Sequence, residues 1–166
     1  MSRQIVVIRH GKAEAHSSRD FARVLASRGR QDSARLGLWL ASRDLDAPAR
    51  AYVSAAARAQ QTWDEVRPGV ADLDVEVDVT EALYDAGSDA VLELVTTTPP
   101  DVHTVFVVGH NPTMADVVWS LTETESPART TFERRGLPTA ACAIVECESW
   151  EDPRGILSAF ATPDDY

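Results

Sequence analysis

A chain of 166 residues is long enough for one domain with a buried core, and a formal net charge of −10 makes this chain strongly acidic. The acidity argues against nucleic-acid or anionic-membrane partners, because both require a basic surface. Hydrophobic residues make up 44% and charged residues 25%, which is ordinary for a soluble globular protein. The apolar run before Arg9 is too short for a signal peptide or a membrane span, so the expected location is cytoplasmic.

Strand-like and helix-like segments alternate along the chain, which predicts an α/β fold. In chain order, the segments are a strand at 4–8, a helix at 29–43, a strand at 50–54, a helix at 57–67, a strand at 74–78, a helix at 88–98, a strand at 104–108, a helix at 111–122 and strands at 140–147 and 156–160. This order predicts a three-layer α/β/α sandwich around a mainly parallel sheet. The last two strands have little room for a crossover helix between them, so we expect them to pair antiparallel.

The boundary signals complete this outline. Asn111 as N-cap and Pro112 at the first helical position mark a strong helix start. The segment 122–140 is the least regular and is predicted to be a long loop. The chain has no internal repeat, low-complexity tract or linker, so residues 1–166 are expected to form a single domain.

The cysteines and histidines give no sign of a metal centre. Cys142 and Cys147 lie in one expected strand at a spacing of five, which places them on opposite faces and argues against a mutual disulfide. No Cys/His cluster has the spacing of zinc ligands. We therefore expect no metal and no other cofactor.

Two of the expected strands end in the same way. The runs "IVVI" and "TVFVV" each lead into a histidine beside a glycine, His10 in "RHG" and His110 in "VGHNP". In open α/β sheets, ligands bind outside the carboxyl ends of the strands, so both imidazoles could face one pocket. A single histidine of this kind is more often a solvated loop residue, but two in matched contexts favour a functional site.

The end of a third expected strand, at 50–54, has features of an anion-binding site. "YVS" leads into "SAAARAQQT", with Ser54 as a plausible helix cap and Arg58 in the first helical turn. Helix N-termini attract anions through free N–H groups and the helix dipole. Taken alone, Arg58 would be read as a surface arginine. Together with Arg9, the two histidines and the helix start after His110, it predicts an anion-binding pocket in an otherwise acidic chain.

The elements "RHG", "SAAARAQQT" and "VGHNP" resemble the motifs of the histidine phosphatase superfamily. The stretch "DFARVLASRG" at 20–29 is similar to the Asp-x-x-Arg-Pro-Leu-x-x-x-Gly element of the short SixA-type phosphohistidine phosphatases. "RHG" alone is a weak signal, but four elements in this order are a specific one. The anchors span residues 5 to 112, and the resemblance implies the phosphoglycerate mutase-like α/β fold.

The resemblance implies a role for each matching residue. His10 would attack phosphorus and carry a transient phosphoryl group, which suits an imidazole whose ordinary pKa leaves it largely neutral near pH 7. Arg9 and Arg58 would clamp phosphoryl oxygens, and His110 would stabilise charge in the transition state. Gly11 would let the backbone approach closely because it has no Cβ. This chemistry needs no metal.

Two further assignments are weaker. Arg23 matches a phosphate-contacting arginine of the subgroup, but Val24 follows it where the subgroup usually has proline. Glu81 in "TEALYDAG" is the best-placed candidate for a general acid that protonates a leaving alkoxide. A loop carboxylate without a catalytic role is an equally good interpretation of Glu81.

The sequence therefore predicts a metal-independent phosphatase with a phosphohistidine intermediate, acting on phosphohistidine in proteins. A phosphatase of small phosphate esters or anhydrides is the alternative enzyme, so the expected partner is a phosphorylated protein or a small phosphorylated molecule. A mutase is less favoured, since such mutases usually carry insertions that enclose the substrate. A non-catalytic phosphate-sensing module is the alternative from another class, and the intact set of histidines and arginines argues against it.

Overall fold

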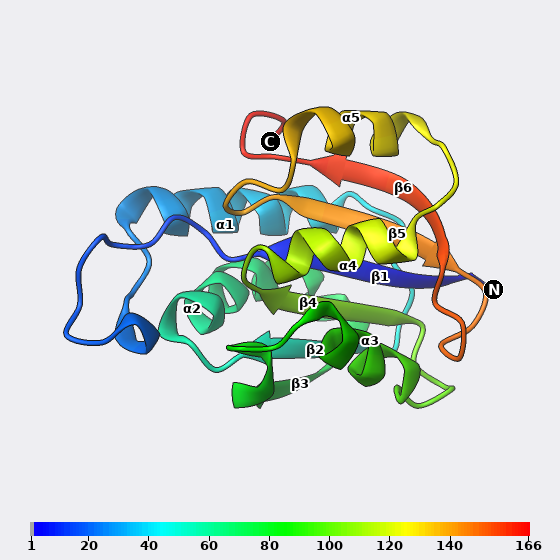
Figure 1. Cartoon of the computed structure of the whole chain (residues 1–166), viewed down its shortest axis with the longest axis horizontal. Helices are drawn as coiled ribbons and strands as arrows, with labels where there is room; N and C mark the ends of the chain where they lie inside the picture. Colours follow the sequence, from blue (N-terminus) through cyan, green and yellow to red (C-terminus); the bar gives the residue numbers. More distant parts are fainter. Residues whose placement is uncertain (1) are drawn as a thin grey trace.

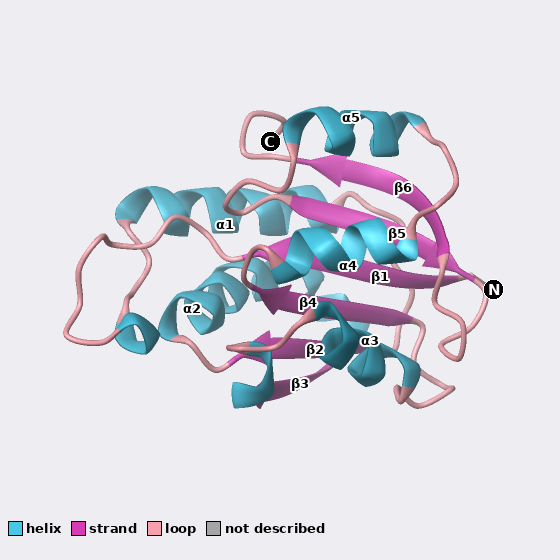
Figure 2. Ribbon diagram, in the orientation of Figure 1, coloured by secondary structure: helices cyan, strands magenta, loops and turns pink. Residues whose placement is uncertain are grey.

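The computed structural model describes residues 2–166 and joins six strands into one sheet, in the order β3-β2-β4-β1-β5-β6 (Figures 1 and 2). The strands are β1 (Arg3–Arg9), β2 (Ala49–Ser54), β3 (Val75–Thr80), β4 (Thr104–Gly109), β5 (Cys142–Cys147) and β6 (Gly155–Ala161). Neighbours among β1 to β4 are parallel, whereas β5 is antiparallel to both β1 and β6. The mainly parallel sheet and its antiparallel last pair agree with the sequence-based prediction.

Helices cover both faces of the sheet. They are α1 (Ser27–Ala41), α2 (Ala57–Val66), α3 (Ser88–Thr96), α4 (Thr113–Leu121) and α5 (Pro127–Arg135), with short 3₁₀ segments η1 (Asp20–Ala22), η2 (Arg67–Leu73) and η3 (Glu81–Leu83). Helices α1 and α2 contribute to one hydrophobic cluster, and α3, α4 and α5 contribute to the other (Figure 1). This is the expected three-layer sandwich. Within residues 2–166, no helix combines the length and apolarity needed to cross a bilayer.

The two-sided cover explains why the central strands read as continuous apolar runs. In β1, Val6 and Ile8 face α1 and α2, while Ile5 and Val7 belong to the opposite cluster. Every residue of β4 is buried. Parallel strands buried on both faces carry apolar side chains at successive positions rather than at every second one.

The two cysteines confirm the alternation of faces in β5. Cys142 belongs to the cluster under α1 and α2, and Cys147 belongs to the cluster on the other side. Both thiols are free and buried. Burial raises the pKa of the Cys147 thiol to about 11, so this thiol is protonated at neutral pH.

The prediction of a long loop over 122–140 was wrong, because α5 lies inside this segment. The helix has a regular start: the Ser126 hydroxyl oxygen accepts a hydrogen bond from the Arg129 N–H at 3.1 Å, and Pro127 occupies the first turn. Phe132 is the one buried residue of this helix. A helix with so few apolar positions has almost no hydrophobic periodicity, so its cap was the better signal.

The predicted start of the preceding helix, α4, also needs correction. Helix α4 begins at Thr113 with Pro112 as its cap, so Asn111 lies outside the helix. The Asn111 side chain still accepts from the Ala115 N–H at 3.3 Å, and its Nδ2 donates to the Leu137 carbonyl at 2.8 Å. Asn111 therefore ties the start of α4 to the loop before β5.

Candidate active site

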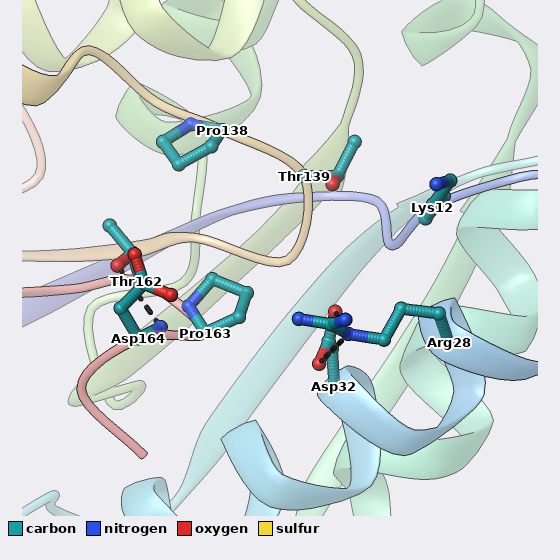
Figure 3. A pocket seen from close by; sticks show the side chains of 8 residues that line it. All are labelled: Lys12, Arg28, Asp32, Pro138, Thr139, Thr162, Pro163 and Asp164. Atoms are coloured by element: carbon teal, nitrogen blue, oxygen red, sulfur yellow. Dashed lines mark hydrogen bonds and ion pairs between the residues drawn. The ribbon is translucent and has the colours of Figure 1, made fainter.

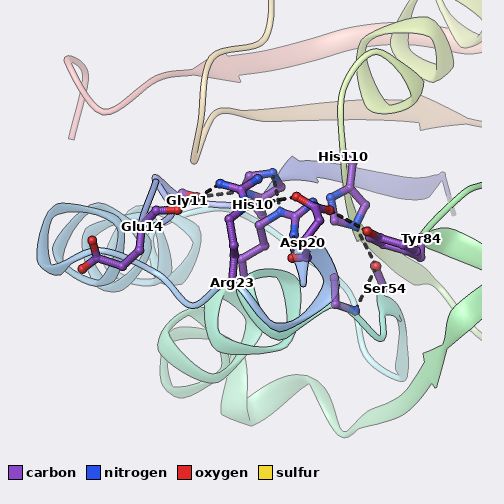
Figure 4. Close-up of polar contacts among 10 residues, drawn as sticks. His10, Gly11, Glu14, Asp20, Arg23, Ser54, Tyr84 and His110 are labelled. Carbon is purple, nitrogen blue, oxygen red and sulfur yellow. Dashed lines mark hydrogen bonds and ion pairs between the residues drawn. The ribbon is translucent and has the colours of Figure 1, made fainter. Parts of the chain in front are cut away.

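The carboxyl ends of β1, β2 and β4 meet at one edge of the sheet and bring the predicted residues together (Figure 4). The ring centroids of His10 and His110 are 5.2 Å apart. Ser54, the last residue of β2, places its hydroxyl 2.7 Å from His110 Nε2. Three strand ends that are far apart in the sequence thus converge on one site.

His10 is buried, and one of its ring nitrogens is fixed by the backbone. Its Nδ1 lies 2.7 Å from the carbonyl oxygen of Gly11. A carbonyl can only accept, so Nδ1 carries the proton and Nε2 keeps its lone pair. Burial is the main cause that lowers the pKa of His10 to about 4, which leaves the imidazole neutral at pH 7. The His10 imidazole is therefore buried and held in one orientation, with Nε2 unprotonated.

Arg58 is held in place by three hydrogen bonds. Its Nε lies 3.4 Å from His10 Nε2, while its two terminal nitrogens donate to the backbone carbonyl of Asp20 at 2.9 Å and to the Asp20 carboxylate at 3.1 Å. The Arg58 side chain is only 6% exposed. Its guanidinium is therefore not an open fork but a fixed plane whose Nε faces the nitrogen of His10.

Asp20 is the centre of a polar network that sequence reasoning did not find (Figure 4). Besides Arg58, its carboxylate accepts from the Tyr84 hydroxyl at 2.5 Å and from Arg23 Nε at 3.0 Å. These partners, with Tyr84 the largest cause, hold the pKa of Asp20 well below its usual range. Arg23 also donates to the Glu14 carbonyl at 3.0 Å. The structure thus connects Arg23 to the site through Asp20.

His110 faces the same space from β4. Burial is the main cause that lowers its pKa to about 4, so it too is neutral at pH 7. The Ser54 hydroxyl oxygen accepts from the Ala56 N–H at 3.3 Å and also forms a hydrogen bond with His110 Nε2, in which either atom can be the donor. The other ring nitrogen of His110, Nδ1, is buried and has no hydrogen-bond partner within residues 2–166. The edge of the Tyr84 ring packs against His110 at 5.6 Å.

Arg9 and Gly11 flank His10 in the chain. The Arg9 guanidinium donates to the Leu137 carbonyl at 3.1 Å, and its Nε is buried without a partner in the part of the chain that the structure describes. At Gly11 an added Cβ would lie 2.8 Å from the carbonyl oxygen of Gly29 in α1. The absence of a side chain at Gly11 is therefore required by the approach of α1.

Glu81 does not join this cluster. It is the first residue of η3 and is exposed, and its carboxylate makes no hydrogen bond to another described residue. Tyr84, three residues later, is the side chain of this segment that reaches the site. The available signal for Asp20 was its place three residues before Arg23, and for Ser54 its place at a strand end. Tyr84 had no signal in the sequence.

The site combines a neutral His10 nitrogen with a buried Arg9 N–H donor that has no partner in residues 2–166. Such a donor stabilises negative charge strongly in a dry environment. The sequence model of the histidine phosphatase superfamily (branch 1) matches residues 5–89, about half of the chain, which include His10, Arg58 and Asp20. The chain belongs to the histidine phosphatase superfamily. It is a phosphatase, and its substrate is a phosphorylated molecule.

Solved structures similar to this histidine phosphatase include candidate phosphohistidine phosphatases SixA. The one from Nakamurella multipartitia is 28% identical with a TM-score of 0.82, covering 98% of this chain and 97% of that chain. The one from Agrobacterium tumefaciens is 26% identical with a TM-score of 0.78, covering 97% and 99%. The protein histidine phosphatase SixA complexed with tungstate is 25% identical with a TM-score of 0.74, covering 97% of both chains.

A relative from Mycobacterium tuberculosis (strain CDC 1551 / Oshkosh), the uncharacterized protein MT1313, is 30% identical over 150 residues. The match covers 87% of this chain and 90% of that protein. Together with the structural matches, it extends the similarity well beyond residues 5–89 and includes the strand that leads to His110. In residues 2–166 of this histidine phosphatase, no group of three His, Cys, Asp or Glu side chains is placed to hold a metal ion.

Proposed function

We propose that this phosphatase hydrolyses phosphohistidine in proteins, through a phosphoryl intermediate on His10 and without a metal ion. The observation that carries the proposal is the fixed tautomer of His10, whose Nδ1 donates to the Gly11 carbonyl and whose unprotonated Nε2 accepts a hydrogen bond from Arg58 Nε at 3.4 Å. Similarity to SixA phosphohistidine phosphatases supports the substrate. The proposal includes a single histidine phosphatase domain over residues 1–166, supported by one sheet that runs from Arg3 to Ala161.

In the first step, His10 Nε2 forms a bond to phosphorus while the bond between phosphorus and the substrate imidazole breaks. The electron pair goes to the leaving nitrogen, which takes a proton from solvent. Water then attacks the phosphorylated His10, the P–Nε2 bond breaks, and inorganic phosphate leaves as the water gives up a proton. Arg9, Arg58 and His110 stabilise the charge on the phosphoryl oxygens in both steps.

Three residues have lesser roles in this proposal. Arg23 binds phosphate only at the rim, since Asp20 already occupies its Nε. Gly11 gives the backbone its close approach to α1 and so sets the position of His10. Glu81 acts as a general acid only for substrates with a basic leaving group, because an imidazole leaves phosphorus readily once it is protonated.

The partner in this proposal is a phosphorylated protein, and the location is the cytoplasm. A small phosphorylated molecule is the alternative substrate. The imidazole of phosphohistidine leaves without a general acid of the enzyme, whereas the alkoxide of an alkyl phosphate ester needs one.

The proposed function is tested by rapid quench with a ³²P-labelled phosphohistidine protein in the presence of EDTA. The wild type should show an acid-labile, base-stable phosphoenzyme and release phosphate, and His10→Ala should show neither while keeping its circular dichroism spectrum. Glu81→Gln should turn over the phosphohistidine protein at the wild-type rate. Efficient hydrolysis of an alkyl phosphate, lost by 10²–10⁴-fold in Glu81→Gln, with no action on phosphohistidine would assign the enzyme to small esters instead.

A further inference from the structure

Beside the phosphatase site lies a pocket of about 280 Å³ that the proposed reaction does not use (Figure 3). Lys12 and Arg28 lie on one side of it, and Asp164 lies on the other. Pro138 and Pro163 give it apolar walls. The pocket is open to solvent and large enough for one side chain of a bound polypeptide.

The pocket adjoins the catalytic histidine on two sides. Lys12 follows His10 by two residues, so their Cα atoms are at most about 7 Å apart. Pro138 follows Leu137, whose carbonyl accepts a hydrogen bond from Arg9 at 3.1 Å. An extended polypeptide advances about 3.3 Å per residue. A protein that presents phosphohistidine to His10 therefore brings side chains within two positions of it to this pocket.

The cationic side of the pocket is built on a buried carboxylate. Asp32 is 3% exposed and lies 3.2 Å from Arg28 Nε and 3.5 Å from a terminal nitrogen of Arg35. Arg35 also donates to the Pro163 carbonyl at 3.1 Å. Two arginines thus share one buried acid, which fixes Arg28. The pocket lining itself carries two cations, Lys12 and Arg28, and two carboxylates, Asp32 and Asp164, and Arg35 behind Asp32 adds one positive charge.

The cations of Lys12 and Arg28 are available to a ligand. Among the residues that the structure describes, no hydrogen bond engages the Lys12 amine or the terminal nitrogens of Arg28. A guanidinium with free terminal nitrogens matches the geometry of a carboxylate. Asp164 on the opposite side disfavours a doubly charged phosphate more than a singly charged carboxylate.

We propose that this pocket binds the carboxylate of an acidic residue that lies within two positions of the phosphohistidine in the protein substrate. The pocket gives the phosphatase a preference for acidic sequence around the phosphorylated histidine. This inference rests on the proposed phosphohistidine phosphatase function.

The test uses two phosphohistidine peptides that differ only in carrying Glu or Gln at the two positions on either side of the phosphohistidine. The wild type should have a roughly three- to tenfold lower KM for the Glu peptide, the size expected of two partly exposed ion pairs, with similar kcat. The preference should shrink between 50 mM and 500 mM salt. Lys12→Gln/Arg28→Gln should abolish the preference, and Lys12→Glu should reverse it.

Two controls separate binding from folding. Arg30→Gln also removes an arginine of α1, but this arginine pairs with Glu65 and does not line the pocket, so it should keep the preference. Turnover of an aryl phosphate should be unchanged in the Lys12 and Arg28 variants. Equal KM values for the two peptides in the wild type, or a preference that survives the double substitution, would overturn the inference. Failure to hydrolyse either peptide while the aryl phosphate is hydrolysed would overturn the proposed function, and this inference with it.

Discussion

At the scale of single residues, some polar groups of the site have their hydrogen bonds satisfied by the protein and others do not. Both terminal nitrogens of Arg58 donate hydrogen bonds to Asp20, whereas Arg9 Nε and His110 Nδ1 have no partner in residues 2–166. Buried polar groups without a partner are costly in the free protein. A phosphoryl group that hydrogen-bonds to these atoms would remove this cost, so the same groups that lower the stability of the protein favour binding.

Arg58→Lys tests how much of the function depends on the fixed guanidinium plane. Lysine keeps the charge, but it cannot contact the Asp20 carbonyl, the Asp20 carboxylate and His10 Nε2 at once. We expect kcat/KM for a phosphohistidine protein to fall by about 10²–10³-fold, the loss typical of one preorganised charge-stabilising donor. Arg30→Lys, a surface exchange on α1, should change it less than twofold. Activity of Arg58→Lys within threefold of wild type would show that charge alone suffices.

The sequence located this site only in part, and the reason is physical. His10, His110 and Arg58 follow strand ends or start a helix, and topology places such positions at one edge of the sheet. Tyr84 reaches the site from the end of η3, just after Leu83, and Asp20 reaches it from η1. No local pattern determines where these segments pack. For the same reason, the sequence suggested Glu81 from this segment, whereas Tyr84 is its side chain that contacts Asp20 and His110.

At the scale of elements, the close approach of α1 to the chain after β1 sets the position of His10. A Cβ at Gly29 would lie 2.1 Å from the carbonyl oxygen of Lys12, and one at Gly11 would lie 2.8 Å from the carbonyl oxygen of Gly29. The Ala26 N–H donates to the same Lys12 carbonyl at 2.9 Å. Helix α1 and the turn that follows His10 therefore touch backbone to backbone. Gly11 and Gly29 are visible in the sequence, but their close approach in the fold could not be predicted from it.

Gly29→Ala should force α1 away from the turn that follows His10. The added methyl group meets backbone that cannot rotate aside, so we expect a loss of about 1–3 kcal/mol in the free energy of unfolding. Turnover should fall with it, since this turn adjoins His10. Gly87→Ala is the matched control, because a Cβ there has nothing within 4 Å and its φ of −81° suits alanine. Urea unfolding of both variants measures the difference, and equal midpoints would refute the packing argument.

At the scale of the whole molecule, a chain of net charge −10 keeps a site rich in cations and neutral imidazoles at one edge of its sheet. Folding buries His10 and His110 and lowers the pKa of each to about 4, from an ordinary value of 6.5. Between these values the unfolded chain binds more protons than the folded one, so this contribution to stability rises with pH. It is complete above pH 6.5 and is lost as the pH falls towards 4. Asp20, whose pKa is also lowered, loses its contribution only below its ordinary value of 3.8.

The last prediction separates these two histidines from every other titrating group. The free energy of unfolding of the wild type should fall between pH 7 and pH 5, and the two histidines should account for about 2 kcal/mol of this fall once solvent screening is allowed for. His10→Asn/His110→Asn removes both groups, so its stability should vary less with pH across the same window. His16→Asn, which replaces an exposed histidine, should keep the wild-type dependence. Urea titrations of the three proteins at pH 5, 6 and 7 give the slopes. A double variant as sensitive to pH as the wild type would mean that the histidines are charged in the folded site. His10 would then lack the unprotonated Nε2 that the proposed attack on phosphorus requires.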